Sequence, residues 1–174
     1  MKQLFKTILV IIFMVIITTI TVSCSKPYIE ERPFSAKAIK DGRFIDHGDG
    51  VVLDTKTGLM WANKDNGNDT KWHDAKFYCE NYRGGGYKDW RMPTLKELES
   101  LYDEHKIQPV ACSSSNDIHI ATDFINITCL NLWSSETSTT TNECDIFNFG
   151  SGTRSAYVCQ MIFARALPVR FISR

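Results

Sequence analysis

Residues 89–97 read Asp89-Trp90-Arg91-Met92-Pro93-Thr94-Leu95-Lys96-Glu97 and give the clearest structural signal in the chain. Thr94 and Glu97 have the spacing of a capping box, in which the threonine oxygen accepts a hydrogen bond from a free helix amide and the glutamate reaches back to the cap. The apolar residues that follow at helical spacing are Leu95, Leu98, Leu101 and Tyr102. We therefore expect a helix that begins at Thr94 and ends near His105.

A further helix is expected before this one. Its apolar residues recur at helical spacing at Trp72, Ala75, Cys79 and Tyr82. Asp69 or Thr70 can cap this helix, because both side chains accept hydrogen bonds from free amides. The glycine-rich segment 83–87 should end it and form an open loop.

Short strands are expected on both sides of the two helices. Apolar runs on either side of His47-Gly48-Asp49-Gly50 predict a hairpin, and residues 59–61 predict a further strand. The later apolar runs cover residues 132–135, 145–149, 156–163 and 167–172. Residues 106–132 are weakly periodic and read as a long loop. This order of elements predicts an α+β fold with segregated helices and strands.

Composition excludes several classes of protein. The chain has 174 residues with 20 basic and 20 acidic side chains, so no net charge recruits nucleic acid, and we expect no nucleic-acid partner. Hydrophobic residues make up 43% of the chain, too many for a disordered protein. The length suits one domain, which we place at residues 41–174. Six cysteines indicate an oxidising compartment.

The first 23 residues have the pattern of a signal peptide. Lys2 and Lys6 precede an unbroken apolar run at residues 8–17. A membrane-spanning helix is the alternative, but residues 8–22 would reach only about 22 Å, against a hydrocarbon core of about 30 Å. Removal of residues 1–23 would leave 18 basic and 20 acidic side chains.

The end of this segment, Thr21-Val22-Ser23-Cys24, resembles a bacterial lipobox. The resemblance implies that Cys24 is acylated, becomes the first mature residue and holds the protein to a lipid bilayer. Residues 24–40 would then be the lipidated cysteine and a tether. Ser25 after the cysteine implies the outer membrane of a Gram-negative cell envelope. Ordinary cleavage that leaves a free Cys24 thiol is the alternative.

Two strings, Thr57-Gly58-Leu59-Met60-Trp61 and Asp89-Trp90-Arg91-Met92-Pro93-Thr94, together resemble the C-terminal domain of the Legionella collagen-like adhesins. Further matching residues are Asp49-Gly50, Asp54-Thr55-Lys56, Trp72, Ala75, Cys79, Gly86-Tyr87-Lys88, Glu97-Leu98, Trp133-Ser134-Ser135 and Val169-Arg170. The resemblance implies a C-type-lectin-like fold, with two helices packed on small antiparallel sheets and long loops. It also implies binding of sulfated polysaccharide and assembly of a homotrimer. Phe171 stands where the family often has a cysteine.

The cysteines left beside a lipidated Cys24 are Cys79, Cys112, Cys129, Cys144 and Cys159, and five cannot all pair. A hairpin turn centred on residues 151–152 would place Cys144 opposite Cys159, at a separation suited to a disulfide. Cys112 and Cys129 would then close the irregular loop, for about 3 kcal/mol of loop-closure entropy. Cys79 would remain a buried thiol. A bond between Cys79 and Cys159 stays open as the rival pairing.

No catalytic or metal-binding pattern stands out. The four histidines have no metal-ligand spacing, and the acidic runs 46–50 and 65–69 lack the ligand order of an EF-hand and are typical of turns. We therefore expect no enzyme, no metal and no cofactor; a relative of the lectin-like formylglycine-generating oxidases is the least favoured alternative. The four tryptophans lie in apolar contexts and should be core. Arg91 should hold a carboxylate or loop carbonyls.

These features together predict an envelope-anchored lipoprotein whose domain binds an extracellular ligand, with a glycan as the favoured class. The candidate ligand-binding residues lie in two polar stretches and are Asn116, Asp117, Glu136, Asn142 and Glu143. Their side chains could bond sugar hydroxyls, although a plain solvated loop is the alternative. The basic residues are not clustered in sequence, which disfavours heparin-like ligands. A structural module that binds an envelope protein is the alternative function.

Overall fold

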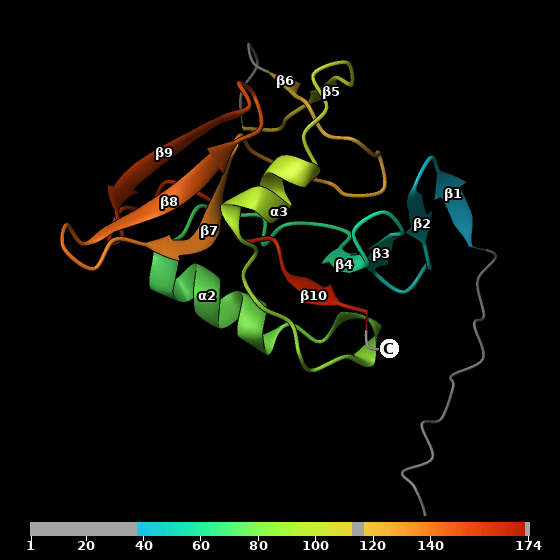
Figure 1. Ribbon diagram of the computed structural model, residues 1–174, viewed down its shortest axis with the longest axis horizontal. Helices are drawn as coiled ribbons and strands as arrows, with labels where there is room; N and C mark the ends of the chain where they lie inside the picture. The colour runs from blue at the N-terminus through green and yellow to red at the C-terminus, as the bar shows by residue number, and fades with distance from the viewer. Residues whose placement is uncertain (1–37, 113–116, 173–174) are drawn as a thin grey trace, which may run out of the picture. The chain divides into compact units, whose positions relative to one another are not determined.

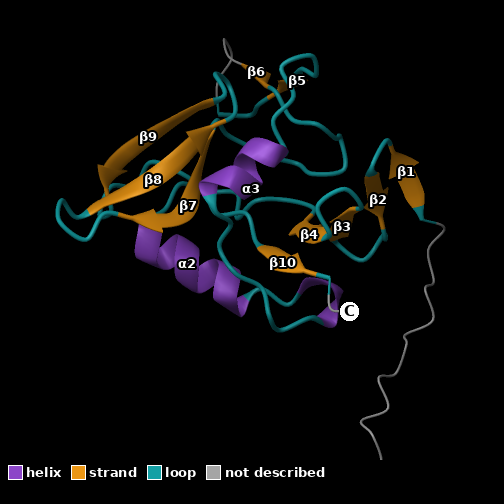
Figure 2. Cartoon of the chain, in the orientation of Figure 1, coloured by secondary structure: helices purple, strands orange, loops and turns teal. Residues whose placement is uncertain are grey.

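The computed structural model describes residues 38–112 and 117–172 (Figure 1). The expected signal peptide, Cys24, most of the tether and Asn116 lie outside the described residues. Within the described ranges, two helices and three small antiparallel sheets confirm the α+β fold, and long loops join the elements (Figure 2). This arrangement is consistent with a C-type-lectin-like fold. None of the described helices is long and apolar enough to cross a membrane.

The first sheet joins segments from both ends of the described chain. Its sequential strands are β1 (Ile39–Asp41), β2 (Phe44–Asp46), β3 (Val51–Asp54) and β4 (Leu59–Ala62). The last strand, β10 (Val169–Phe171), lies antiparallel beside β4 and completes the order β1-β2-β3-β4-β10 (Figure 1). The predicted hairpin around residues 47–50 and the strand at 59–61 are therefore confirmed.

The turn between β3 and β4 depends on a glycine and a buried aspartate. Gly58 has a φ of +70°, a left-handed conformation that favours glycine, and its N–H donates to the Asp54 carbonyl at 2.9 Å. The buried Asp54 carboxylate accepts a hydrogen bond from the Lys56 amide at 3.0 Å. Arg43 Nε lies 3.1 Å from the same carboxylate, so its charge is paired inside the sheet.

The second sheet consists of β7 (Asn131–Thr137), β8 (Glu143–Asn148) and β9 (Thr153–Val158). Its β8–β9 turn is centred on residues 150–151 rather than on the predicted 151–152, because Asn148 pairs with Thr153. The Asn148 side-chain oxygen fixes this turn by accepting hydrogen bonds from the Gly150 and Ser151 amides at 2.9 and 3.0 Å. The predicted register was therefore wrong.

The shifted register places Tyr157, not Cys159, opposite Cys144. The predicted strand at 156–163 was also too long, because β9 ends at Val158, where the Met161 amide bonds to its carbonyl. The Cys144–Cys159 disulfide forms nevertheless, with a Cα–Cα distance of 5.1 Å. The Cys159 amide donates to the Asn142 carbonyl just beyond the ladder, which keeps Cys159 beside β8.

The predicted cysteine pairing is confirmed. Cys112 is bonded to Cys129, with a Cα–Cα distance of 5.3 Å, and Cys144 to Cys159. Cys79 is a free, buried thiol on the first helix, so the rival Cys79–Cys159 pairing is excluded.

The first helix is α2 (Trp72–Asn81), and its N-cap residue is Lys71, which makes no side-chain cap hydrogen bond. The predicted capping by Asp69 or Thr70 is therefore wrong. A distant segment satisfies the first amide of the helix instead, because the Trp72 amide donates to the Cys159 carbonyl at 3.1 Å. Just before the helix, the Thr70 amide donates to the Ala164 carbonyl. The helix is followed by the short 3-10 turn η1 (Gly84–Gly86) in the predicted glycine-rich loop.

Two indole groups tie the start of α2 to β7. Trp72 Nε1 donates to the Ser134 carbonyl at 2.7 Å, and Trp133 Nε1 donates to the Thr70 carbonyl at 2.8 Å. All four tryptophans are buried, which confirms their predicted place in the core. Their N–H groups explain why tryptophan rather than phenylalanine suits positions 72 and 133.

The second helix, α3 (Leu95–Ser100), has the predicted capping box at its start. The Glu97 amide donates to Thr94 Oγ1, and the Thr94 amide donates to the Glu97 carboxylate at 2.8 Å. The helix ends at Ser100, well before His105, because tertiary pairing takes over. Tyr102 forms a bridge with Ile120, and the Leu101 carbonyl accepts from the Ala121 amide at 2.7 Å.

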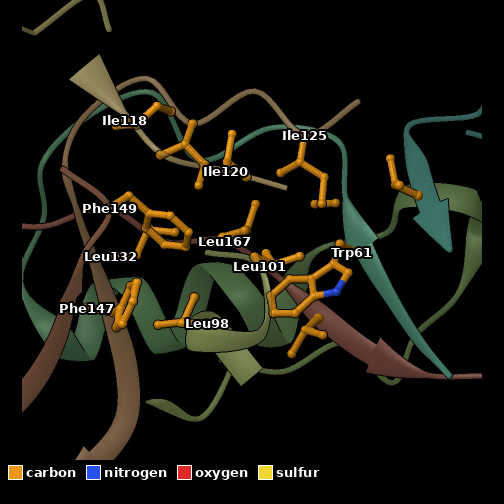
Figure 3. Packing of buried hydrophobic residues seen from close by; sticks show 14 of the residues in the cluster. Trp61, Leu98, Leu101, Ile118, Ile120, Ile125, Leu132, Phe147, Phe149 and Leu167 are labelled. Carbon is orange, nitrogen blue, oxygen red and sulfur yellow. The ribbon is translucent and has the colours of Figure 1, made fainter. Parts of the chain in front are cut away.

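Much of the core comes from the segment that was predicted to be a loop. Before β7 begins at Asn131, the described residues of this segment form one short ladder, of β5 (Gln108–Pro109) and β6 (Asp117–Ile118). Four isoleucines of this segment are nevertheless at most 2% exposed: Ile118, Ile120, Ile125 and Ile127. They belong to one core cluster with Leu98, Leu101 and Trp61, in which Figure 3 labels Ile118, Ile120 and Ile125. The Cys112–Cys129 bond therefore closes a segment that is itself part of the core.

We expect Cys79 to resist alkylation in the folded protein. Its side chain is fully buried, and burial raises the pKa of the thiol, so little reactive thiolate forms. Peptide mapping without reduction should find the 112–129 and 144–159 bonds, with N-ethylmaleimide on Cys79 only when denaturant is present. Labelling of Cys79 in buffer alone, or a bridge to Cys159, would contradict this arrangement.

Candidate functional site

An open groove of about 430 Å³ lies between α2, the segment that leads into α3, and β10. The residues that line it are Trp72, Lys76, Glu80, Arg91, Met92, Thr94, Glu97, Ser135 and Phe171. They come from four separate parts of the chain, and three of those parts are helix or strand (Figure 1). A groove whose walls are regular elements holds its side chains in defined positions.

One face of α2 forms the first wall. Trp72, Lys76 and Glu80 are four residues apart and therefore lie above one another along the helix. Lys76 Nζ lies 5.5 Å from the centre of the Trp72 ring and 4.0 Å from the Glu80 carboxylate. Because both charged side chains are half exposed, this pair contributes little to stability, and both groups can meet a ligand.

A tight ion pair forms the second wall. Arg91 Nη1 and Nη2 donate to the two Glu97 oxygens at 2.8 and 2.6 Å, which is a bidentate geometry. Burial alone would raise the pKa of the Glu97 carboxyl, but hydrogen bonds from Arg91 and Thr94 outweigh it and leave this pKa lowered. The Arg91 pKa is raised, mainly by the same hydrogen bonds to Glu97. The prediction that Arg91 holds a carboxylate is confirmed.

Phe171 of β10 provides an aromatic ring beside this pair. The Arg91 guanidinium lies 4.9 Å from the ring centre, within the range of a cation–π contact. Phe171 is nevertheless 59% exposed, which is unusual for a phenylalanine in a strand. An exposed ring next to a half-buried cation is a surface on which an apolar ligand face can pack.

Glu136, one of the predicted ligand-binding residues, lies next to the groove, but its carboxylate binds the first amide of α3. Both of its carboxylate oxygens lie 3.0 Å from the Leu95 amide, so it satisfies the start of the helix. Its neighbour Ser135 lines the groove. The structure therefore gives Glu136 a structural contact, and a ligand contact of this residue stays a prediction.

The other predicted residues lie elsewhere. Asn142, with a φ of +53°, and Glu143 lie at the β7–β8 connection, where Glu143 accepts a hydrogen bond from Thr141. Asp117 is on β6, near the opposite end of β8, where the His119 amide bonds to the Phe149 carbonyl. The structure does not bring these residues together into one site.

Two carboxylates of the second sheet act on a third, that of Asp145. Burial raises the pKa of the Asp145 carboxyl, and the charges of Glu136 and Glu143 raise it further. Two of the predicted residues, Glu136 and Glu143, therefore each lie close enough to Asp145 to act on its carboxyl.

The two acidic runs form turns, as expected. Asp46 Oδ1 accepts a hydrogen bond from the Gly48 amide, and Asp65 Oδ1 accepts one from the Gly67 amide, both at 2.8 Å. The buried Asp65 carboxylate also accepts hydrogen bonds from the amide and hydroxyl of Thr128 and lies 3.9 Å from Arg165 Nη1. Both Asp65 oxygens thus have protein donors. Among residues 38–112 and 117–172, no group of three or more His, Cys, Asp or Glu is placed to hold a metal ion.

The sequence analysis did not predict the groove, although the helical spacing of some lining residues is present in the sequence. The spacing of Trp72, Lys76 and Glu80 is visible, but their exposure to a groove depends on how β10 and the Arg91 segment pack. Phe171 was noted only because it replaces a cysteine. Its role as a wall follows from the pairing of Val169 with both Trp61 and Arg91.

Substitution of Glu97 by glutamine should lower the free energy of unfolding by about 1–2 kcal/mol at pH 7, because it leaves the half-buried Arg91 charge unpaired. Glutamine can still complete the capping box, so the loss reports mainly the ion pair. Urea denaturation measures it. Glu99→Gln is the matched control on α3; it removes an exposed pair with Arg154 and should cost less than about 0.5 kcal/mol.

The free energy of unfolding of Glu97→Gln should depend less on pH than that of the wild type. Since folding lowers the Glu97 pKa, this carboxylate adds stability above its usual value of 4.5, and that stability is lost as the pH falls through the folded pKa. The difference between wild type and Glu97→Gln should therefore shrink below pH 4.5. An unchanged difference in acid would contradict the ion-pair assignment.

The model of the Lcl C-terminal domain family matches residues 50–170, a range that includes the groove apart from Phe171. The search of curated proteins finds no match.

Proposed function

The chain belongs to the Lcl C-terminal domain family, which indicates an adhesin-like domain, and we propose that this domain binds an extracellular glycan at the groove. Binding would involve no catalysis. The chain would be a lipoprotein of the cell envelope, held in the outer membrane through Cys24. The family resemblance adds assembly into a homotrimer to the proposal.

The observation that carries the proposal is the composition of the groove. Phe171 offers an exposed ring, while Lys76 and Glu80 offer a half-exposed donor and acceptor within one groove. A sugar ring has an apolar C–H face and an edge of hydroxyl groups, so it fits a site with one aromatic surface and a few polar groups.

The surrounding scaffold supports binding without rearrangement. The groove walls are fixed by the Arg91–Glu97 pair and by the strand pairing of β10, and the start of α2 is tied to the Cys144–Cys159 disulfide through the Trp72 amide. A preformed site loses less conformational entropy when it binds its ligand.

A protein-interaction module is the second candidate, and exposed apolar side chains favour it. Phe77 is 68% exposed on α2, and Phe171 and Ile172 are exposed at the end of β10. Exposed aromatic residues are enriched at protein interfaces. This candidate predicts a protein that co-purifies with the chain and no binding to any glycan.

We expect glycan binding to depend on Phe171 and not on Phe77. Protein expressed from the full-length chain and purified in detergent should bind a subset of a glycan array, equally with calcium and with chelator. Phe171→Ala should weaken this binding about tenfold, as expected when one aromatic contact is lost. Phe77→Ala removes a similarly exposed ring outside the groove and should change it less than about twofold. An array without signal would reject the proposal.

The lipid anchor is tested separately. Cys24→Ala should abolish palmitate labelling and release the protein from the membrane fraction, because acyl chains on Cys24 are the proposed attachment. Membrane fractionation before and after the substitution measures this. Retention of the unlabelled variant in the membrane would contradict the anchor and leave the glycan proposal untouched.

A further inference from the structure

The arginines of the described residues are already engaged by partners within the chain. Five of them pair with carboxylates: Arg43 with Asp54, Arg91 with Glu97, Arg154 with Glu99, Arg165 with Asp65 and Asp69, and Arg170 with Asp89. The sixth, Arg83, donates to the carbonyls of Glu80 and Tyr82. Sulfate and carboxylate groups on a polymer are recognised best by guanidinium groups that can donate two parallel hydrogen bonds. These guanidinium groups are turned to internal partners instead.

The groove has balanced charge. Its cations are Lys76 and Arg91, and its anions are Glu80 and Glu97. Arg91 and Glu97 are in direct bidentate contact, and the lowered Glu97 pKa keeps that carboxylate ionised. Opposite charges at such short distance cancel at the distance of a ligand, so the groove offers no net attraction to an anion.

The remaining lining is mainly apolar. Trp72, Met92 and Phe171 contribute hydrophobic surface, and Phe171 is the most exposed of the three. The charged groups that are half exposed are Lys76 and Glu80, one donor and one acceptor on the same helix face, and Ser135 adds an exposed hydroxyl. This combination suits a ligand with an apolar face and hydroxyl groups and without a formal charge.

We propose that the groove takes an uncharged sugar residue, a hexose or an N-acetylhexosamine of a neutral glycan, in preference to a sulfated one. The C–H face of the sugar packs on Phe171, and its hydroxyl groups bond to Glu80 and Lys76. This inference rests on the proposed glycan-binding function and specifies its ligand class.

Matched neutral and charged probes test it. Full-length protein in detergent is titrated with dextran, cellohexaose and chitohexaose, and in parallel with dextran sulfate and heparin. We expect binding to at least one neutral probe, with an affinity that changes less than about twofold between 0.05 and 0.5 M NaCl, because no charge is screened. Phe171→Ala should weaken this binding about tenfold, and Lys76→Gln less than about threefold. Phe77→Ala, which lies outside the groove, is the control and should leave the affinity nearly unchanged.

The outcomes separate this inference from the proposed function. Binding confined to the sulfated probes, falling steeply with salt and lost in Lys76→Gln, would overturn the neutral ligand and leave glycan binding in place. Binding to neutral probes that Phe171→Ala leaves unchanged would overturn the assignment to the groove. Binding to none of the probes and to no glycan on the array would overturn both. Thermal unfolding of each variant confirms that it is folded.

Discussion

The carboxylate of Glu97 is the contact on which the groove and its surroundings depend. It completes the capping box of α3 through the Thr94 amide and holds Arg91 with two hydrogen bonds. The backbone of Arg91 in turn exchanges two hydrogen bonds of 2.9 Å with Val169 of β10. One side chain therefore links a helix start, a loop and the edge strand of the first sheet. These contacts account for Arg91, Thr94 and Glu97 among the residues that match the family.

The second sheet is joined to α2 in a comparable way, through Cys159. Its carbonyl accepts the Trp72 amide, its own amide bonds to Asn142, and its sulfur bonds to Cys144. Cys159 therefore takes part both in the disulfide and in the hydrogen bond at the start of α2. Because α2 and Arg91 each form a wall of the groove, the positions of these two walls are set by contacts between segments far apart in the sequence.

Local signals predicted the parts of the fold that local interactions determine. The capping box and the first hairpin were visible in the sequence. The two disulfides were predicted correctly, although the hairpin register used to pair Cys144 with Cys159 was wrong. Tertiary contacts decided the remainder: Ala121 ends α3 early by bonding to Leu101, and Asn148 shifts the last hairpin by capturing two turn amides. The four isoleucines between 118 and 127 were not predicted to be core residues, because their spacing matches neither a helix nor a strand. The groove was missed for a related reason, since its walls meet only after β10 pairs with both β4 and Arg91.

The position of β10 also bears on the order in which the protein can fold. Trp61 of β4 finds its strand partner Val169 roughly 110 residues further along the chain. Until those residues are available, one edge of β4 has open backbone groups and the groove lacks a wall. Closing so long a loop is entropically costly, so the five-stranded sheet should be among the last parts to become complete. A chain that has lost β10 would expose the edge of β4 and lack the Phe171 wall of the groove, and such a fragment should be prone to aggregate.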